Sequence, residues 1–297
     1  MEQIQNNRVI TDLYRENAQF PGIALDGSDV YLCWQRFVDR HDSLMASCRR
    51  GDEVVWEREI SDGGEVLHPV ILAHGGAIWY AWSEYARENW RILARCYRDG
   101  RWGEVLTVAS GEALFFPRLF TWQGRLHVIW TEQHKGSAAA VLCPLTEAGP
   151  GGAETVSVVG EAYRAGAAEG GDGNLYVAYD GFDGKQYKLF ARARTAAGWS
   201  EEIVVSQGED WASTPWIAAK PDGAVVGWYD YGYMAVYSVR SADLTVRDGA
   251  LTAVNPQCLK EGVDWYLDLH VASNSSGLQA MAYTRSKYDV LVCTRQG

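Results

Sequence analysis

Short apolar segments separated by glycine-rich turns repeat along the chain, and the second segment of each repeat ends in a large aromatic residue. These residues are Trp34, Trp82, Trp130, Tyr179, Trp228 and Tyr283. They are spaced 48, 48, 49, 49 and 55 residues apart. Six copies of one unit at a nearly constant period predict a repeat architecture.

Each unit begins at a common position 13 residues before its aromatic residue. This position is occupied by Pro21, Pro69, Pro117, Gly166, Pro215 and His270. From there the pattern predicts four short strands, which in the second unit cover residues 69–72, 78–82, 91–96 and 105–108. Glycine and aspartate turns interrupt every segment before a helix could reach a stable length, so a helical solenoid is not expected.

Four-stranded units of this length are typical of propeller blades. The predicted fold is all-β, a six-bladed β-propeller of four-stranded blades in a single domain over residues 1–297. The last unit ends with its third strand, residues 291–294. The unassigned segment 8–11 is expected to supply the missing outer strand, so that an N-terminal strand closing the last blade joins the two ends of the ring.

The composition narrows the class of protein. Apolar residues make up 47% of the chain and charged residues 22%, which predicts a folded protein with a large core. The net charge is −11, from 27 Lys and Arg against 38 Asp and Glu, and this balance argues against binding nucleic acid through its phosphates. No apolar run approaches the roughly 20 residues of a membrane helix, so no membrane partner is expected.

The cysteines follow the repeat. Cys48, Cys96 and Cys143 lie 13 or 14 residues after the aromatic residue of their units, and Cys293 stands on the corresponding strand of the sixth. A recurring position of this kind indicates buried core thiols rather than a disulfide framework. Because residues 1–7 also lack the apolar segment of a secretory signal, a cytoplasmic location is expected. The chain has no Cys-x-x-Cys pair, and no zinc or other cofactor is expected, while a calcium ion in the channel stays open.

The turns between the third and fourth strands carry a family resemblance. Segments 50–56, 97–102 and 195–199 each end in tryptophan after a glycine-containing turn, and they look like degenerate Asp boxes. In this the chain resembles the sialidase-like, BNR-repeat superfamily of six-bladed propellers. The resemblance implies a sugar ligand, since the family includes sialidases, other exo-glycosidases and relatives that only bind sugars. At the Phe-Arg-Ile-Pro motif of sialidases this chain has Phe20-Pro21-Gly22-Ile23, so no arginine triad is carried over.

Charged residues interrupt the apolar pattern two residues past five of the six repeated aromatic residues. The positions hold Arg36, Glu84, Glu132, Gly181, Asp230 and Arg285. In a propeller they would form a charged ring at the mouth of the central channel. Glu84 and Glu132, on neighbouring blades, are predicted to act as acid and base or nucleophile, with Asp230 and Tyr229 assisting. Arg36 and Arg285, together with Arg118, are predicted to hold an anionic group of the substrate.

Aromatic residues that do not repeat are predicted to contact the ligand, because their rings can cover the C–H face of a sugar. These are Trp90, Trp211, Trp216 and Trp265. His68 is a further candidate, as a base for a hydrolase or a lyase. It precedes Pro69, at a position where the other units have Phe20, Phe116, Ala165, Thr214 and Leu269.

These features together predict a carbohydrate-active enzyme, similar to glycoside hydrolases, that acts on a sugar with an acidic group in a pocket at the channel mouth. Three alternatives stay open: a polysaccharide or uronate lyase, a non-catalytic lectin-like propeller, and a small-molecule cyclase or isomerase on the same scaffold. The expected partner is a small molecule or an oligosaccharide. The sequence leaves the oligomeric state open.

Overall fold

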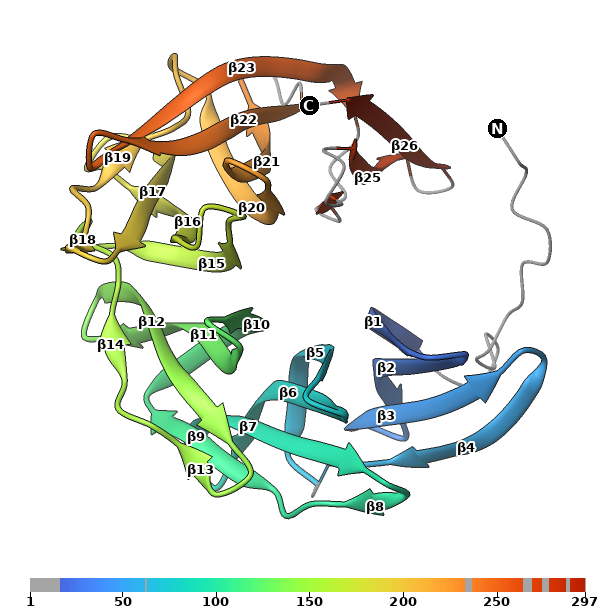
Figure 1. Cartoon of the computed structure of the whole chain (residues 1–297). Coiled ribbons are helices and arrows are strands. Elements are labelled where there is room, and N and C mark those ends of the chain that lie inside the picture. The colour runs from blue at the N-terminus through green and yellow to red at the C-terminus, as the bar shows by residue number, and fades with distance from the viewer. Residues whose placement is uncertain are drawn as a thin grey trace. The chain divides into compact units, whose positions relative to one another are not determined.

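The computed structural model describes residues 17–61, 63–232, 237–263, 269–273, 278–286 and 289–296, with side chains for residues 18–61, 63–232 and 237–262. The predicted N-terminal strand, residues 8–11, lies outside these ranges. The chain divides into two compact units, residues 1–110 and 111–297. In the description of the structure, a unit is one of these two parts and not a single sequence repeat. Each unit is built from consecutive antiparallel sheets, which can be followed by their labels in Figure 1.

The first unit contains two sheets whose strands pair in chain order, except for the last strand of the second sheet. The first sheet consists of β1 (Asn17–Asp26), β2 (Asp29–Val38), β3 (His41–Arg50) and β4 (Glu53–Glu59). The second consists of β5 (Glu65–His74), β6 (Ala77–Ala86), β7 (Asn89–Arg98), β8 (Arg101–Trp102) and β9 (Leu106–Gly111). β8 and β9 both pair with β7, and β9 corresponds to the predicted fourth strand, residues 105–108.

The second unit repeats this order in four further sheets. The third consists of β10 (Ala113–Trp122), β11 (Arg125–His134), β12 (Ser137–Thr146), β13 (Gly149–Pro150) and β14 (Glu154–Thr155). The fourth consists of β15 (Ala162–Glu169), β16 (Leu175–Phe182), β17 (Tyr187–Thr195), β18 (Gly198–Trp199) and β19 (Ile203–Val204). The fifth consists of β20 (Trp211–Lys220), β21 (Gly223–Tyr231), β22 (Tyr237–Arg247) and β23 (Ala250–Val263). The sixth has three strands among the described residues, β24 (Leu269–Ser273), β25 (Leu278–Ser286) and β26 (Asp289–Gln296).

The all-β class and the four-stranded antiparallel sheet predicted for each repeat are therefore confirmed. The repeated aromatic residues form the core, as expected: Trp34, Trp82, Trp130 and Trp228 are at most 4% exposed. Within each unit the first strand of one sheet packs against the first strand of the next, as β1 does against β5 and β15 against β20. The cysteines Cys33, Cys48, Cys96 and Cys143 are buried thiols that are not joined in disulfides.

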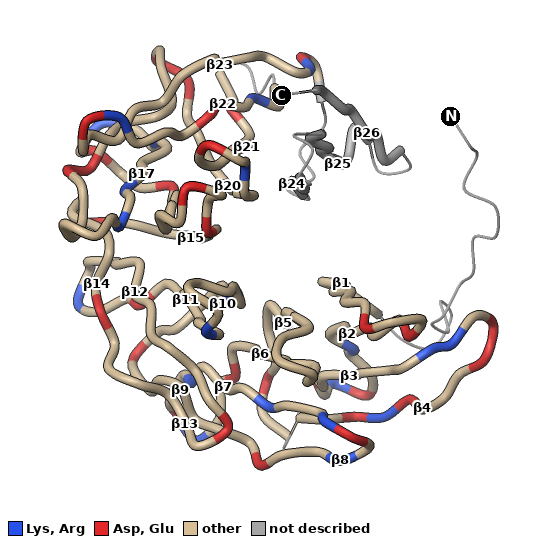
Figure 2. The backbone as a smooth tube through the Cα atoms, in the orientation of Figure 1, with Lys and Arg blue, Asp and Glu red and all other residues tan. Residues whose placement is uncertain are grey.

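Charge increases from the first to the fourth strand of the first sheet. β1 has a single charged residue, Asp26, whereas β4 has four in seven residues. Figure 2 shows this contrast between β1 and the β3–β4 hairpin. The first strand thus carries the least charge of the sheet, although most of its side chains are exposed, and the charged fourth strand is also largely exposed.

The tryptophans of the Asp-box-like turns are held in the same way in two sheets. Arg95 lies 5.3 Å from the ring centre of Trp102, and its Nε donates to the carbonyl of Gly103 at 2.9 Å. In the fourth sheet Arg192 lies 5.3 Å from the Trp199 ring, and its Nε donates to the carbonyl of Ser200 at 2.9 Å. An arginine of the third strand therefore fixes each turn by a cation–π contact and a hydrogen bond.

A β-bulge recurs in the first strand of five sheets. Pairing with the second strand skips two residues, and the first of the two has positive φ. The residues with positive φ are Phe20, His68, Phe116, Arg164 and Thr214. The alignment of the repeats in the sequence placed Ala165 at the position equivalent to His68. The structure corrects this assignment to Arg164. The longer turn between β15 and β16, residues 170–174, adds one residue and shifts the count.

Candidate functional site

The bulges bring residues of neighbouring sheets into contact. In the first unit the rings of Phe20 and His68 meet edge to face, with centroids 5.1 Å apart. In the second unit Arg164 Nη1 donates to Thr214 Oγ1 at 3.4 Å. A bulge turns one side chain out of the regular alternation of a strand, so equivalent side chains of adjacent sheets can meet.

Arg164 forms a two-point ion pair with Asp180, which lies on β16 directly after Tyr179. Its Nε donates to Asp180 Oδ1 at 3.1 Å, and its Nη2 pairs with Oδ2. The Asp180 side chain is fully buried, and burial raises its pKa, while Arg164 and Arg118 act against the rise. The sequence analysis did not include either member of this pair among the candidate site residues. The charge of Asp180 within an otherwise apolar strand was the available signal.

Arg118 lies beside this ion pair and is stacked on an aromatic ring. Its guanidinium carbon is 3.9 Å from the ring centre of Trp216. Burial lowers the pKa of Arg118 to about 10, with Asp180 opposing and Arg164 adding to the shift. Within the described ranges Arg118 has no hydrogen bond or ion pair. A partly buried guanidinium with unused donors is suited to bind a carboxylate or another oxyanion.

A glycine makes the contact between Arg118 and Trp216 possible. Arg118, Gly166 and Trp216 are the first paired residues after the bulge in three consecutive sheets. A Cβ on Gly166 would lie 3.2 Å from Ile217 Cγ2 and 3.9 Å from Arg118 Cδ. Because Gly166 of the fourth sheet has no side chain, Arg118 from the third sheet reaches Trp216 on the fifth. Both residues were predicted to contact substrate, and the structure places them together.

Glu84 is fixed by its own sheet. Trp82 Nε1 donates to Glu84 Oε2 at 3.2 Å, and Arg91 on the adjacent strand forms an ion pair with Oε1. The residue is fully buried. The backbone of Gly64 packs so closely on it that a Cβ there would lie 2.4 Å from Glu84 Cγ.

Asp230 repeats this arrangement in the fifth sheet. Trp228 Nε1 donates to its Oδ1 at 2.6 Å, and Arg240 Nε lies 2.5 Å from its Oδ2. Burial raises the pKa of Asp230 to about 6, although the Trp228 hydrogen bond and Arg240 both favour the ionised form. A carboxyl group that titrates near pH 6 can donate and accept protons close to neutral pH.

Glu132 departs from this pattern. It follows Trp130 as Glu84 follows Trp82, but Ala139 stands opposite it where Arg91 stands opposite Glu84. Trp130 Nε1 is buried and has no hydrogen bond among the described residues. Nor does Glu132 itself form a hydrogen bond or ion pair within the described part of the chain. Of these three acids, Glu132 alone is therefore free of both tryptophan and arginine.

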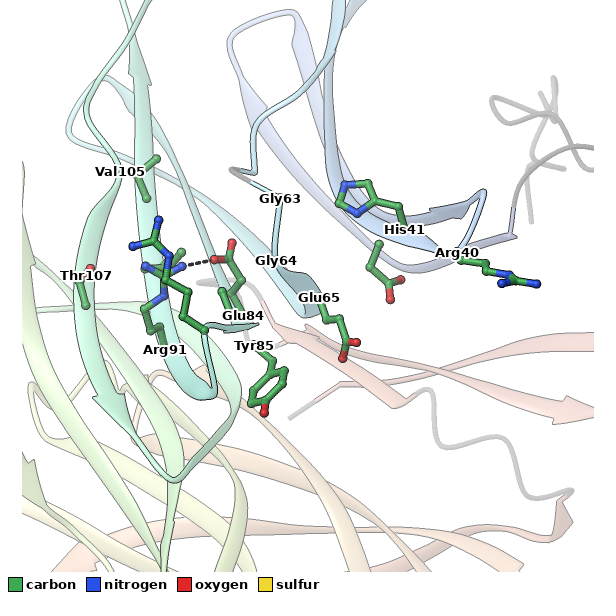
Figure 3. A pocket seen from close by; sticks show the side chains of 14 residues that line it. Arg40, His41, Gly63, Gly64, Glu65, Glu84, Tyr85, Arg91, Val105 and Thr107 are labelled. Atoms are coloured by element: carbon green, nitrogen blue, oxygen red, sulfur yellow. Dashed lines mark hydrogen bonds and ion pairs between the residues drawn. The ribbon is translucent and has the colours of Figure 1, made fainter.

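Glu84 also borders a cavity of about 610 Å³ in the first unit. Figure 3 shows Glu84 and Gly64 in the cavity wall, between Arg91 and Val105 on one side and Arg40 and His41 on the other. The volume lies in the range of small-molecule sites. The lining is strongly charged, and its most buried acid is already neutralised by Arg91. This cavity suits a small polar ligand.

The remaining candidates lie in different surroundings. Arg36 forms an ion pair with Glu59 at 3.4 Å, and the rings of Trp90 and Tyr85 lie 5.3 Å apart. Tyr229 is 1% exposed and packs in the core of its sheet. Trp211 is 38% exposed. Trp265 and the side chain of Arg285 lie outside the described residues.

Two further features are absent from the described residues. Within them, no three or more His, Cys, Asp or Glu side chains are grouped so that they could hold a metal ion. No helix long and apolar enough to cross a membrane occurs in this part of the chain either.

The fold resembles that of sialidase-like enzymes. A neuraminidase-like protein of A/little yellow-shouldered bat/Guatemala superimposes with a TM-score of 0.57 and 8% identity, over 90% of this chain and 89% of that one. Hydrazine synthase from Kuenenia stuttgartiensis gives 0.59 and 13%, over 99% of both chains. A puromycin-hydrolyzing peptidase from Mycobacterium tuberculosis gives 0.54 and 16%, over 90% of this chain and 42% of that one.

At these identities the likeness defines the fold and not the activity, and the three relatives have different activities by name. No protein-family model matches the sequence, and the comparison with curated proteins gives no match. The class that the structure defines is thus an all-β protein with a propeller-like fold. Its function has to be argued from its own side chains.

Proposed function

We propose that the chain is a carbohydrate-active enzyme of glycoside hydrolase type that acts on a sugar bearing an acidic group. The observation that carries the proposal is Arg118, a partly buried cation stacked on Trp216 with no ion-pair partner among the described residues. With Arg164 and Asp180 the group has a net charge of +1, so an anionic ligand completes it. Trp216 adds an aromatic surface that suits the C–H face of a pyranose.

Glu132 is proposed as the carboxyl group that performs acid–base chemistry at the glycosidic bond. Glu84 and Asp230 are each bound to a tryptophan and an arginine, which fixes them in place. A catalytic carboxyl group must be able to reach a substrate oxygen within hydrogen-bond distance. Glu132, without an internal partner in the described residues, meets that requirement better than the other two.

The proposal includes the six-bladed ring predicted from the repeat, with the N-terminal strand closing the last blade. Support comes from the first sheet, where Ile23 and Leu25 on β1 are each 65% exposed. Apolar side chains in such a group are usually covered by another element. If the ring closes over this face, Ile23→Asp combined with Leu25→Asp lowers the melting temperature strongly. The ring closure is wrong if the double variant melts like the unaltered protein.

A thermal-shift series tests the ligand class. Glucuronic acid, galacturonic acid and N-acetylneuraminic acid are compared with glucose and galactose. A ligand at one hundred times its Kd stabilises a protein by about 2.7 kcal/mol. We expect at least one acidic sugar to raise the melting temperature, and Arg118→Gln to abolish this rise. Arg125→Gln, an exposed arginine on β11, is the matched control. Equal shifts in Arg118→Gln and the unaltered protein would contradict the proposed site.

Hydrolysis is tested with 4-methylumbelliferyl glycosides of the acidic sugar that binds. We expect Glu132→Gln to lose turnover and to keep the thermal shift, because an amide still fills the site but cannot exchange a proton. Glu147→Gln, an exposed residue next to β12, is the control. Binding without turnover in the unaltered protein would favour a sugar-binding propeller instead of an enzyme.

A further inference from the structure

Six aromatic side chains form a continuous row in the second unit, along one edge of the fourth and fifth sheets. We call this set the aromatic row; it consists of Tyr163, Phe182, Tyr187, Trp211, Tyr231 and Tyr237. Neighbouring ring centroids in the row are 5.3 to 6.1 Å apart. Their interplanar angles range from 34° to 58°, so the rings are tilted and none is stacked face to face.

The row is built from residues at the ends of strands. Phe182 faces Tyr187 across the β16–β17 pair, and Tyr231 faces both Trp211 on β20 and Tyr237 on β22. The contact between Tyr187 and Trp211, with centroids 5.4 Å apart, joins the two sheets. The backbone pairing of five strands therefore fixes the positions of these rings before any ligand binds.

The side chains of the row combine apolar and polar surface. Four of its six members are tyrosines, and it contains no aliphatic side chain. Trp211 is 38% exposed, and the other five rings are half-buried. Tyrosine and tryptophan offer an apolar ring together with a polar group at its rim. Sugars present the complementary pattern, a C–H face bordered by hydroxyl groups.

The row is continuous with the Arg164–Asp180 pair. Tyr163 directly precedes Arg164 on β15 and stands opposite Asp180 on β16. At the other side of the pair, Arg164 is close enough to Tyr231 to act on its pKa, which burial raises. An oligosaccharide whose acidic sugar lies at Arg118 and Arg164 can therefore continue over the aromatic row.

We infer that the aromatic row binds the second and following units of an oligosaccharide whose acidic unit lies at Arg118 and Arg164. The inference rests on the proposed function and adds to it the size of the substrate: a chain rather than a single sugar. Trp211 is the main contact, because it is the most exposed ring and lies between Tyr187 and Tyr231. Affinity then increases with chain length until the row is covered.

The test measures Kd for oligogalacturonides of one to six units by isothermal titration calorimetry. In the unaltered protein we expect the hexamer to bind about tenfold or more tightly than the monomer, because each added unit gains ring contacts. Trp211→Ala is expected to remove most of this difference and to leave the monomer unchanged. Trp211→Phe keeps an aromatic ring at this position and is expected to retain most of the difference in affinity between hexamer and monomer.

A neutral series, cello-oligosaccharides of one to six units, separates this inference from the proposed function. Length-dependent binding of the neutral series through Trp211, without preference for acidic sugars, supports the row and contradicts the acidic specificity. Acidic binding that does not change with length overturns the inference alone. Equal losses for monomer and hexamer in Trp211→Ala also overturn it, because they indicate that the row only supports the fold. Failure of both series at every length overturns the row as a sugar site.

Discussion

Asp230 gives the sharpest quantitative prediction, because its carboxyl group is 2% exposed and its pKa is raised from 3.8 to about 6. Burial is the main cause of this rise. Between pH 4 and pH 6 the folded protein therefore holds a proton that the unfolded chain releases. Stability contributed by this group is full below pH 4 and is lost as the pH rises through 6. The pKa difference corresponds to about 3 kcal/mol.

The perturbation is Asp230→Asn, which keeps an oxygen to accept the Trp228 hydrogen bond and removes the titration. Arg240 is 34% exposed at its side chain and can be hydrated when its partner is neutral. The free energy of unfolding is measured by urea titration from pH 4 to pH 7 for both proteins. We expect the unaltered protein to lose about 3 kcal/mol relative to Asp230→Asn over this interval.

Asp183 provides a control of opposite sign. The backbone N–H groups of Lys185 and Gln186 donate to its Oδ1 at 2.8 and 2.9 Å, and these bonds lower its pKa. Its contribution to stability is therefore present at neutral pH and is lost as the pH falls. Parallel pH curves for Asp230→Asn and the unaltered protein would refute the assignment of a burial-raised pKa. A carbon NMR titration of the Asp230 carboxyl group measures the same quantity directly.

Two further substitutions test the packing described above. Gly166→Val places branched carbons next to Ile217 and Arg118, and we expect about 1–3 kcal/mol of destabilisation with loss of the thermal shift by acidic sugars. An unchanged shift would show that the glycine does not shape the site. Arg91→Ala leaves the buried Glu84 without its counter-ion and should lower the free energy of unfolding by about 3 kcal/mol in urea titration. Adding Glu84→Gln should recover part of this loss, and a strictly additive double variant would contradict the pairing.

The sequence determined the β-sheet repeat, because its signals are local. Strands of period two, glycine turns and one aromatic residue per unit can be read without knowing any long-range contact. The buried tryptophans such as Trp82 and Trp130 confirm that interpretation. The interpretation failed by one residue at Ala165, because the longer turn 170–174 changes the count without changing the pattern.

The chemistry of the candidate site required the tertiary structure. Glu84 and Glu132 occupy equivalent positions, yet only Glu84 has an arginine opposite it, and that depends on the pairing of a different strand. The contact of Arg118 with Trp216 joins the third and fifth sheets across a glycine of the fourth. Residue type repeats along the chain, but the neutralisation of a charge depends on which side chain the neighbouring strand or the next sheet places beside it, and the repeat pattern does not contain that information.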